Sequence, residues 1–411
     1  MNSYNLYIGG NIYGAGNIGD DAVLQGILSI VNSAIPDVKI TVGTERGERL
    51  DYLPPDVKYI RSYDLKQVAK AIRECDCFIS GGGTMIGDEL DLSFPLGYNA
   101  KLISIAKLHG KRVSMLAIGA NRLQSEAGAK MARNIVRLCD LITLRDEESR
   151  SVCLELYAGS SPVTTADPAF LLEAKETPRT KELKERLRAR GKVFGINVVN
   201  EAWAHLNVYK NSIAKACEYF SSQYGYLPVF FCNEVRPGNF FDFDANSQTA
   251  ALLRCEHELL EPVYYSPEEM IDILSVFDFV IGMRMHSMIF AAVAGTPFVA
   301  ISRVDKVDNF MRLFSRRVSS SIEHCDCNQL IADIDKLLED RETYQNYVAE
   351  RVAILRQNCL QNVELILNLL NERRVFWHKA NVSSLRFILN VVLSENKFYK
   401  KFRHLLRGKI T

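Results

Sequence analysis

Short apolar segments alternate with helix-forming segments along most of this 411-residue chain. In the first half, strands are expected at LYIGG, KITVGTE, CDCFISGGG, RVSMLAIGA and LITLRD, with helices from Asp20 and near Ala100–Leu108. Strands that alternate with helices predict βαβ units and a parallel sheet covered on both faces. The pattern restarts at VFGINVVN and continues through LPVFFC, FDFVIG and FVAIS. The chain is therefore predicted to be an α/β protein with two doubly wound, Rossmann-like lobes.

The length also predicts more than one domain, because single hydrophobic cores stop growing near roughly 250–300 residues. We expect an N-terminal lobe over 1–175, a linker that contains a polar helix over 176–192 and a C-terminal lobe over 193–335. A long helical pattern with one break covers Cys327–Glu372. Its part over 336–371 is expected to form helices that pack across the lobes.

Composition narrows the class of protein. A hydrophobic content of 47% and a charged content of 24% are typical of globular proteins with large cores. The first ten residues lack a basic start and an apolar segment, so no secretory signal is expected. The ten cysteines are scattered, which favours reduced thiols and a cytoplasmic location. The two Cys-Asp-Cys pairs lack the usual metal-binding spacing, so no metal site is expected.

The C-terminal segment 372–411 is strongly basic, with ten Lys or Arg and two Glu, whereas the rest of the chain is mildly acidic. Its apolar residues recur at helical spacing with basic residues between them. This pattern is typical of an amphipathic helix that lies on a membrane surface, which for a cytoplasmic protein would be the inner face. Docking of the segment onto the acidic body or onto a partner chain stays open. A nucleic-acid-binding arm is disfavoured, because the aliphatic face is continuous.

The segment Val280–Ile301 carries the clearest functional pattern. An apolar strand ends at Gly282, Arg284 and His286 follow at once, and a helix is expected over Ser287–Ala294. In an α/β sheet this turn lies at the carboxyl end of the strands, where ligands bind. Arginine can bind a carboxylate or phosphate with two N–H groups, and histidine can deliver a proton near neutral pH. The structural alternative is a satisfied histidine beneath the helix and an arginine paired with an acid.

Further cations follow other strands. Arg145 comes directly after LCDLITL, and Arg303 and Lys306 follow FVAIS. If these side chains share one sheet edge with Arg284, their ligand should be a compact anion. For Arg145, the alternative is a surface pair with Asp146, which would add little stability.

Two glycine-rich turns follow strands in the first half. Gly14–Gly19 reads G-x-G-x-x-G, which is typical of dinucleotide binding. Five residues separate the strand from this motif, however, and Asp20 and Asp21 would repel a pyrophosphate. They are better explained as an N-cap and first-turn acids, so a structural turn or a loop facing a polar substrate is favoured. Gly81–Gly83 fits either an anion-binding backbone or a tight turn, and no P-loop lysine follows.

With these motifs in hand, the chain resembles the polysaccharide pyruvyl transferase family over about Tyr7–Phe314. The motifs that carry the resemblance occur in the expected order: Tyr13-Gly14-x-x-Asn17-x-Gly19-Asp20, Gly81-Gly82-Gly83 with Asp88, Arg145-Asp146-x-x-Ser149, Asp167-Pro168-Ala169, Arg284-x-His286, Gly295-x-Pro297 and Lys306. Gly119-Ala120-Asn121 departs from the Gly-Pro that is frequent in the family, and Met285 replaces the usual Leu.

The resemblance implies a glycosyltransferase-B-like pair of lobes, with the acceptor on the first and the donor on the second. Such an enzyme transfers pyruvate from phosphoenolpyruvate to a sugar of a polysaccharide or its lipid-linked precursor, commonly as a cyclic ketal. Phosphoenolpyruvate would be a co-substrate, with no cofactor and no metal ion. Arg284 and Arg145 would hold its anionic groups, with Lys306 as a third cation. His286 would act as general acid.

The acceptor side follows from the same resemblance. Asn17, Gly81, Gly82 and Gly83 would contact the acceptor sugar. Asp20, expected on the opposite lobe from His286, is our hypothesis for the base that takes the hydroxyl proton.

Two other functions stay open from sequence. One is a sugar-nucleotide-dependent glycosyltransferase on the same fold, and the other is a non-catalytic, membrane-tethered assembly protein. The acceptor sugar, its linkage, its lipid carrier and the oligomeric state are not identified by the sequence.

Overall fold

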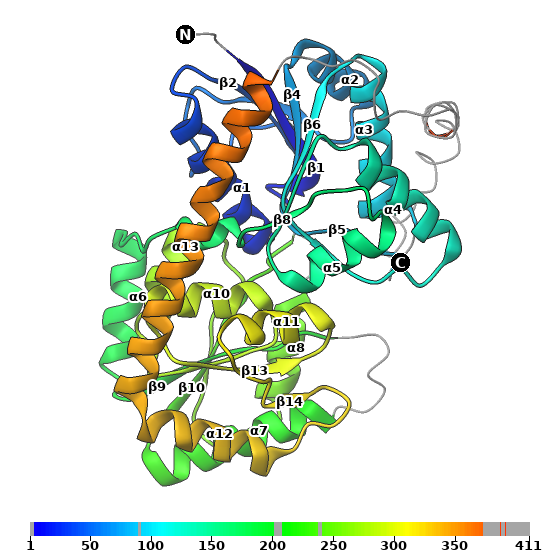
Figure 1. Ribbon diagram of the computed structural model, residues 1–411. Coiled ribbons are helices and arrows are strands. Elements are labelled where there is room, and N and C mark those ends of the chain that lie inside the picture. Colours follow the sequence, from blue (N-terminus) through cyan, green and yellow to red (C-terminus); the bar gives the residue numbers. More distant parts are fainter. Residues whose placement is uncertain are drawn as a thin grey trace, which may run out of the picture. The chain divides into compact units, whose positions relative to one another are not determined.

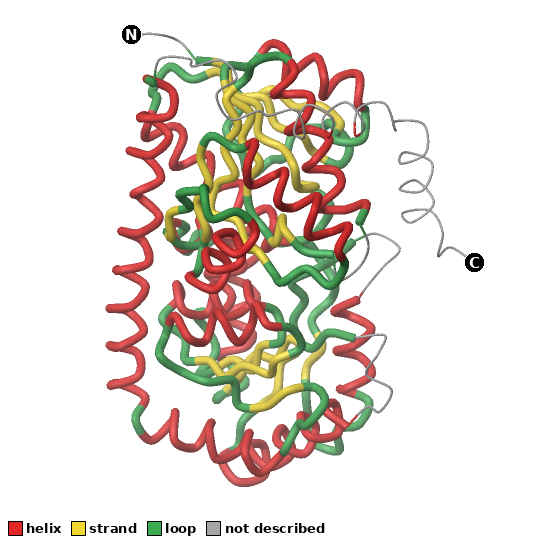
Figure 2. Tube along the Cα trace, turned by 45° about the vertical axis from the view of Figure 1, so that its right-hand side comes forward, coloured by secondary structure: helices red, strands yellow, loops and turns green. Residues whose placement is uncertain are grey.

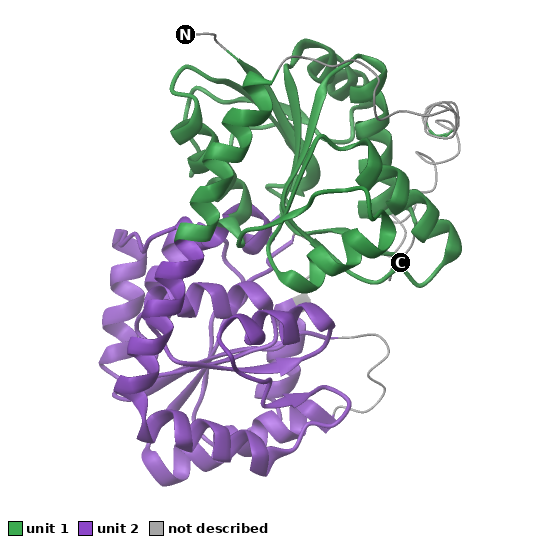
Figure 3. Cartoon of the chain, in the orientation of Figure 1, with its two compact units in different colours: residues 1–15, 23–168, 357–411 green, residues 16–22, 169–356 purple. Residues whose placement is uncertain are grey.

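The chain is described by a computed structural model, which covers residues 4–88, 92–200, 208–236 and 241–372, with Phe387 and Val391. The predicted basic tail at 372–411 lies almost wholly outside these residues. The chain divides into two compact units (Figure 3). The first comprises 1–15, 23–168 and 357–411, and the second comprises 16–22 and 169–356.

The first unit is built on an eight-stranded sheet in which neighbouring strands pair in parallel. Its order is β3-β2-β1-β4-β6-β7-β8, with β5 beside β6. The strands are β1 (Asn5–Tyr13), β2 (Lys39–Thr44), β3 (Lys58–Arg61), β4 (Cys77–Gly81), β5 (Thr84–Ile86), β6 (Arg112–Ala120), β7 (Leu141–Leu144) and β8 (Val163–Thr164). The helices are α1 (Ile18–Ala34), α2 (Leu65–Glu74), η1 (Ser93–Gly97), α3 (Tyr98–Leu108), α4 (Glu126–Leu138), α5 (Glu147–Leu156) and η2 (Pro168–Leu171).

This sheet carries a hydrophobic core on each face (Figure 1). One core joins the sheet to α1 and to the end of the long helix α13 (Arg341–Asn371). The other joins it to α2, α3, α4 and α5. Strand β4 has no solvent-facing side, and all five of its residues are buried. This explains why the strands read as continuous apolar runs rather than as alternating patterns.

The second unit is built on a six-stranded parallel sheet of order β11-β10-β9-β12-β13-β14. The strands are β9 (Val193–Asn197), β10 (Leu227–Phe230), β11 (Glu258–Leu259), β12 (Val280–Gly282), β13 (Phe298–Ser302) and β14 (Ser320–Ser321). The helices are α6 (Pro178–Arg188), α7 (Val208–Tyr224), α8 (Phe241–Ala250), α9 (Pro267–Leu274), α10 (Met285–Ala294), α11 (Asp305–Leu313) and α12 (Cys327–Glu339). In chain order these strands run 3-2-1-4-5-6, the doubly wound arrangement, so the predicted fold class is confirmed.

Helix boundaries confirm some expectations and correct another. The predicted long helical pattern with one break is confirmed as two helices, α12 and α13, separated at Asp340. Helix α6 is the polar helix expected within the linker segment. Helix α10 begins at Met285 rather than Ser287, so Arg284 occupies its N-cap position. Figure 2 shows the alternation of strands and helices along the trace.

The glycine-rich turn before α1 also differs from expectation. Strand β1 continues to Tyr13 through an irregularity, so the motif follows the strand directly and the expected five-residue gap does not exist. Helix α1 begins at Ile18, and the Oδ1 atom of Asn17 accepts the backbone N–H groups of Gly19 (3.0 Å) and Asp20 (3.4 Å). Asn17 therefore caps the helix, and Asp20 is a first-turn acid rather than the cap.

Candidate functional site

The candidate site lies where the strand order of the second sheet reverses. Strands β9 and β12 are neighbours there, although β10 and β11 come between them in sequence. Asn197 ends β9, and Arg284 follows the last residue of β12 by two positions. Ligands of open α/β sheets bind at this point, outside the carboxyl ends of the strands.

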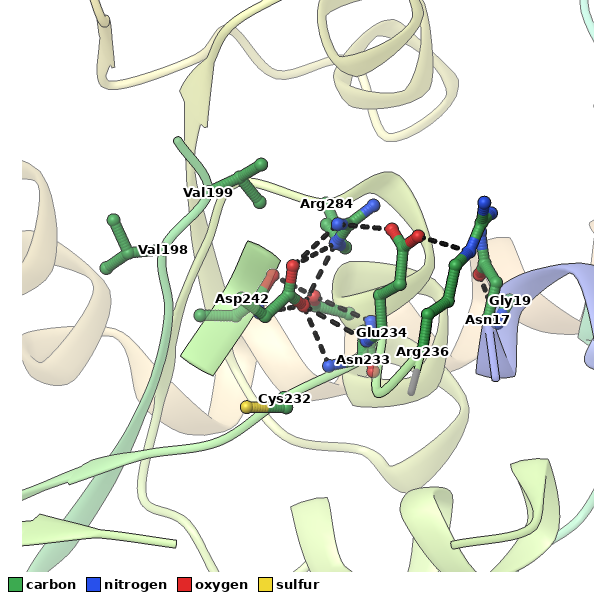
Figure 4. A network of polar contacts seen from close by, with 12 residues as sticks. Asn17, Gly19, Val198, Val199, Cys232, Asn233, Glu234, Arg236, Asp242 and Arg284 are labelled. Atoms are coloured by element: carbon green, nitrogen blue, oxygen red, sulfur yellow. Dashed lines mark hydrogen bonds and ion pairs between the residues drawn. The ribbon is translucent and has the colours of Figure 1, made fainter. Parts of the chain in front are cut away.

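Arg284 is held by two carboxylates (Figure 4). Its Nε atom donates to both carboxylate oxygens of Asp242, at 2.7 and 2.9 Å. Its Nη2 atom lies 2.6 Å from Asp242 Oδ1 and 2.5 Å from Glu234 Oε2. Burial disfavours the charge of Arg284, but Asp242, Glu234 and Asp20 outweigh it and raise the pKa above its usual value. The guanidinium is therefore charged and fixed in orientation.

Asp242 is the centre of this network. It is fully buried in the first turn of α8 and also accepts from Asn197 Nδ2 (3.0 Å) and from the backbone nitrogens of Asn233 (2.9 Å) and Glu234 (3.1 Å). A buried carboxylate persists when its charge is paired and its oxygens are hydrogen-bonded. Asp242 thus ties the loop after β10 to the turn after β12.

Ser287 adds a neutral connection between the same segments. Its hydroxyl donates to Asn197 Oδ1 (2.8 Å) and accepts from Asn233 Nδ2 (2.8 Å). All three side chains are buried. The carboxyl ends of β9, β10 and β12 are therefore held by one polar network, which presents Arg284 from a rigid base.

His286 lies in the first turn of α10 and is half-buried. Its ring rests against Gly19, because a Cβ atom placed on Gly19 would lie 2.4 Å from Nδ1 and 2.6 Å from Cγ. Gly19 is the second residue of α1, where the helical backbone suits any residue, so the ring of His286 is the reason for glycine here. The arginine part of the structural alternative is confirmed, since Arg284 is paired with Glu234 and Asp242. For His286, the general-acid role stays a prediction.

Asp20 belongs to the same compact unit as His286, contrary to the expectation that it lies on the opposite lobe. The reason is backbone pairing: Asn17 bridges Glu234, and Ile18 N donates to Asn233 O (3.0 Å). Asp20 is half-buried, whereas Asp21 is fully buried and accepts from Tyr264 Oη (2.7 Å). Of the two acids, Asp20 is the one that remains accessible.

Arg145 belongs to the first unit and is buried, with 5% of its side chain exposed. It lies 3.6 Å from carboxylate oxygens of both Asp146 and Asp167, and its Nη2 atom donates to Thr84 Oγ1 (3.3 Å). A Cβ atom on Gly119 would lie 2.7 Å from Nη2. Arg145 does lie beside Asp146, as in the alternative, but the pair is buried rather than on the surface. The Arg-Asp and Asp-Pro-Ala motifs meet in one buried cluster, and donor binding by Arg145 stays a prediction.

The three glycines Gly81–Gly83 form a tight turn after β4. Cβ atoms on Gly81 and Gly82 would lie 2.2 Å from Ile27 Cδ1 and 2.1 Å from Val23 Cγ1 of α1. Gly82 and Gly83 have φ angles of 73° and 72°, which favour glycine. Close packing on α1 and this backbone conformation explain the run, and contact with an acceptor stays a prediction.

Lys306 is half-buried at the second position of α11, directly after β13. Strand β13 is the neighbour of β12, so Lys306 follows the strand beside the one that positions Arg284. Its contact with a donor stays a prediction.

Three residues of this site were not predicted from the sequence: Glu234, Asp242 and Arg236. Glu234 also pairs with a second arginine, since its Oε1 atom lies 2.6 Å from Arg236 Nε. Glu234 could have been found, because it follows the apolar run LPVFFC as Arg284 follows its own strand. Asp242 lies in a helix with no comparable pattern, and its partnership with Arg284 exists only in the folded unit.

A pocket of about 650 Å³ in the second unit lies away from these residues. It borders Phe298 and Val299, the first residues of β13, together with parts of α11, α12 and α13. The candidate site lies at the carboxyl ends of the strands, so the pocket is at the opposite sheet edge. Across the residues that the structure describes, no helix is long and apolar enough to cross a bilayer.

Solved structures resemble the chain across most of its length. MnaA of S. aureus in complex with UDP has 11% identity and a TM-score of 0.58, covering 90% of this chain and 98% of that one. HepE of Anabaena with UDP and glucose has 13% identity and a TM-score of 0.55, covering 88% and 98%. The UDP-GlcNAc 2-epimerase of Neisseria meningitidis has 14% identity and a TM-score of 0.55, covering 89% and 100%. At such identities the resemblance shows the fold alone, which is glycosyltransferase-B-like.

Family membership follows from the sequence. A search of curated proteins finds no significant match. The profile described as polysaccharide pyruvyl transferase matches residues 17–305, from the helix cap Asn17 to the start of α11. This range is well over half of the chain and includes Asp20, Arg284 and His286. The chain belongs to the polysaccharide pyruvyl transferase family.

Proposed function

We propose that this protein transfers pyruvate from phosphoenolpyruvate to a sugar of a polysaccharide or of its lipid-linked precursor, forming a ketal. The observation that carries the proposal is the occurrence of a fixed arginine and a half-buried histidine on one turn, at the switch point of a sheet in a family member. Arg284 and His286 are two residues apart, and Asp20 belongs to the same unit.

Arg284 suits a donor anion because only part of its guanidinium is used. Nε and Nη2 interact with Asp242 and Glu234, whereas Nη1 makes no hydrogen bond or ion pair with the residues that the structure describes. The Nη1 edge is therefore available to a carboxylate or phosphate oxygen of the donor. Lys306 and Arg145 are further candidates for the other anionic group.

The chemical step needs an acid and a base. Protonated His286 would give its proton to the methylene carbon of phosphoenolpyruvate, which becomes a methyl group while C2 becomes electrophilic. A sugar hydroxyl then bonds to C2 and loses its proton to Asp20. The C2–O bond to phosphate breaks, phosphate leaves, and a second hydroxyl closes the ketal with loss of its proton. Asn17 would orient the acceptor through its side-chain NH2 group, because its Oδ1 atom caps α1.

No cofactor enters this scheme, since phosphoenolpyruvate is consumed as a co-substrate. N–H donors of the site would hydrogen-bond to the leaving phosphate. Contact of segment 372–411 with the inner face of a membrane, where a lipid-linked acceptor would lie, is part of the same proposal.

A sugar-nucleotide donor is the second candidate, because the structures of MnaA and HepE hold UDP on the same fold. A non-catalytic assembly protein would bind neither donor. Calorimetric titration of phosphoenolpyruvate and of UDP into wild type and Arg284→Ala separates the three. Saturable binding of phosphoenolpyruvate that weakens in the variant supports pyruvyl transfer, and phosphate release with a sugar acceptor completes the assignment. Binding of UDP without phosphoenolpyruvate would reject it in favour of glycosyl transfer.

A further inference from the structure

Arg236 lies beside the start of α1 in the second unit. The segment that carries it pairs with the glycine-rich turn: Asn17 bridges Glu234, and Val235 N donates to Gly16 O (2.8 Å). A Cβ atom on Gly16 would lie 3.1 Å from the backbone nitrogen of Arg236. The turn before α1 and Arg236 are thus held together by main-chain contacts.

Glu234 joins Arg236 to Arg284. Its Oε1 atom lies 2.6 Å from Arg236 Nε, and its Oε2 atom lies 2.5 Å from Arg284 Nη2. The side chain of Glu234 is 7% exposed, so this carboxylate is a buried bridge between two guanidinium groups. Figure 4 shows Arg284 and Arg236 on either side of Glu234, with Arg236 next to the turn at Asn17 and Gly19. The bridge sets the spacing of the two arginines.

The two arginines keep unused donors. An arginine has five N–H groups, and Arg236 places only its Nε atom beside Glu234, in an ion pair that lacks hydrogen-bond geometry. Its Nη1 and Nη2 atoms, like Nη1 of Arg284, make no hydrogen bond or ion pair with the described residues. The side chain of Arg236 is 38% exposed, against 14% for Arg284, so its free edge is the more accessible.

The nearby carboxylates offset the positive charge of the two arginines. Asp242 and Glu234 offset the charges of Arg284 and Arg236, and Asp20 adds a further negative charge nearby. A ligand with several negative charges therefore meets no excess positive charge in this cluster. Its binding would depend on directed N–H donors, for which a planar guanidinium is suited.

We propose that Arg236 is a second anion-binding residue of this site, and that Arg284 and Arg236 bind the two anionic groups of one small ligand on either side of Glu234. The identity of that ligand as phosphoenolpyruvate rests on the proposed function. The anion site itself does not.

The test is calorimetric titration of phosphoenolpyruvate, UDP and inorganic phosphate into wild type, Arg236→Ala, Arg236→Lys and Arg190→Ala. Arg190 is a matched control in the same unit, an exposed arginine paired with Glu256. Arg236→Ala should weaken binding of phosphoenolpyruvate by about ten- to a hundredfold, because charge-assisted hydrogen bonds are lost. Arg236→Lys should recover only part of the affinity, and Arg190→Ala should bind as wild type does.

Arg236 could instead serve only to neutralise Glu234. In that case the double variant Arg236→Ala/Glu234→Gln, which removes both charges, would regain wild-type affinity; recovery overturns the proposal, and continued weak binding supports it. Wild-type affinity in Arg236→Ala also overturns it.

The titrations distinguish failure of the anion site from failure of the proposed function. If UDP binds, phosphoenolpyruvate does not, and Arg236→Ala loses the binding of UDP, the anion site is retained and the proposed function is rejected. If phosphoenolpyruvate binds equally well to wild type and Arg236→Ala, the proposed function is retained and the role of Arg236 is rejected. Failure of wild type to bind any of the three ligands would overturn both.

Discussion

Gly19→Ala isolates the contact between α1 and His286. The added Cβ atom would lie 2.4 Å from Nδ1, 2.6 Å from Cγ and 2.9 Å from Cβ of His286. Ordinary carbon contacts begin near about 3.5 Å, so the ring must retreat by roughly 1 Å. A displacement of about 1 Å at a catalytic group can lower turnover about a hundredfold. We expect kcat to fall by that order while the affinity for phosphoenolpyruvate changes little, since Arg284 is held by other contacts.

The melting temperature of Gly19→Ala should change much less than its turnover. Alanine is up to about 1 kcal/mol better than glycine inside a helix, and Gly19 lies in the first turn of α1. That gain opposes the strain at His286, so the melting temperature should stay within a few degrees of wild type. A variant with normal melting and lost turnover would therefore report on the position of the ring rather than on folding.

The assay is phosphate release at saturating phosphoenolpyruvate and acceptor, with thermal melting measured on the same samples. The control compares turnover of His286→Ala with that of Gly19→Ala/His286→Ala. If Gly19→Ala acts through the imidazole ring, it should not lower turnover further once the ring has been removed. Turnover within twofold of wild type in Gly19→Ala would show that the Gly19–His286 contact does not position the ring for catalysis. A full further loss in the His286→Ala background would show that Gly19 acts elsewhere.

Four more outcomes are expected. His286→Ala should lower kcat by about a hundredfold or more with affinity for phosphoenolpyruvate kept within a few-fold, and equal loss of binding would remove the general-acid role. Asp20→Asn should lower turnover with an authentic acceptor, and normal turnover would eliminate it as the base. Asp242→Asn leaves Arg284 without its main counter-charge, so chemical denaturation should show a loss of about 3 kcal/mol; an unchanged midpoint would contradict the buried pair. Truncation after Glu372 should abolish binding to anionic liposomes while sparing turnover of a water-borne acceptor, and binding that survives would exclude the membrane role of the tail.

The strands were predictable because burial on both faces leaves a strong trace in sequence. Apolar runs such as CDCFISGGG and RVSMLAIGA lie in the middle of a covered sheet, as the fully buried β4 shows. Short edge strands were missed: β3, β8, β11 and β14 have two to four residues, too few to produce a pattern. Helix starts were misplaced by two residues at α10 and at α1, because a cap depends on the path of the preceding chain.

The candidate site was only partly predictable. Arg284 and His286 follow a buried strand, and that position alone marks them as carboxyl-edge residues. Nothing in the sequence connects Arg284 with Asp242, which lies 42 residues away in another helix. Nor does it show that Arg145 is buried against Asp167, so that a side chain expected at an open edge is paired inside the first unit.

The sequence by itself was sufficient to predict the α/β class, the family and the Arg-x-His turn. Hydrophobic periodicity and short motifs depend only on residues that are close together in the chain. The charge state and orientation of each arginine, the glycine that seats His286 and the grouping of Asp20 with the second unit depend on residues far apart in sequence. Desolvation and carboxylate pairing act through space, so only folding determines which cations are already neutralised and which donors remain for a ligand.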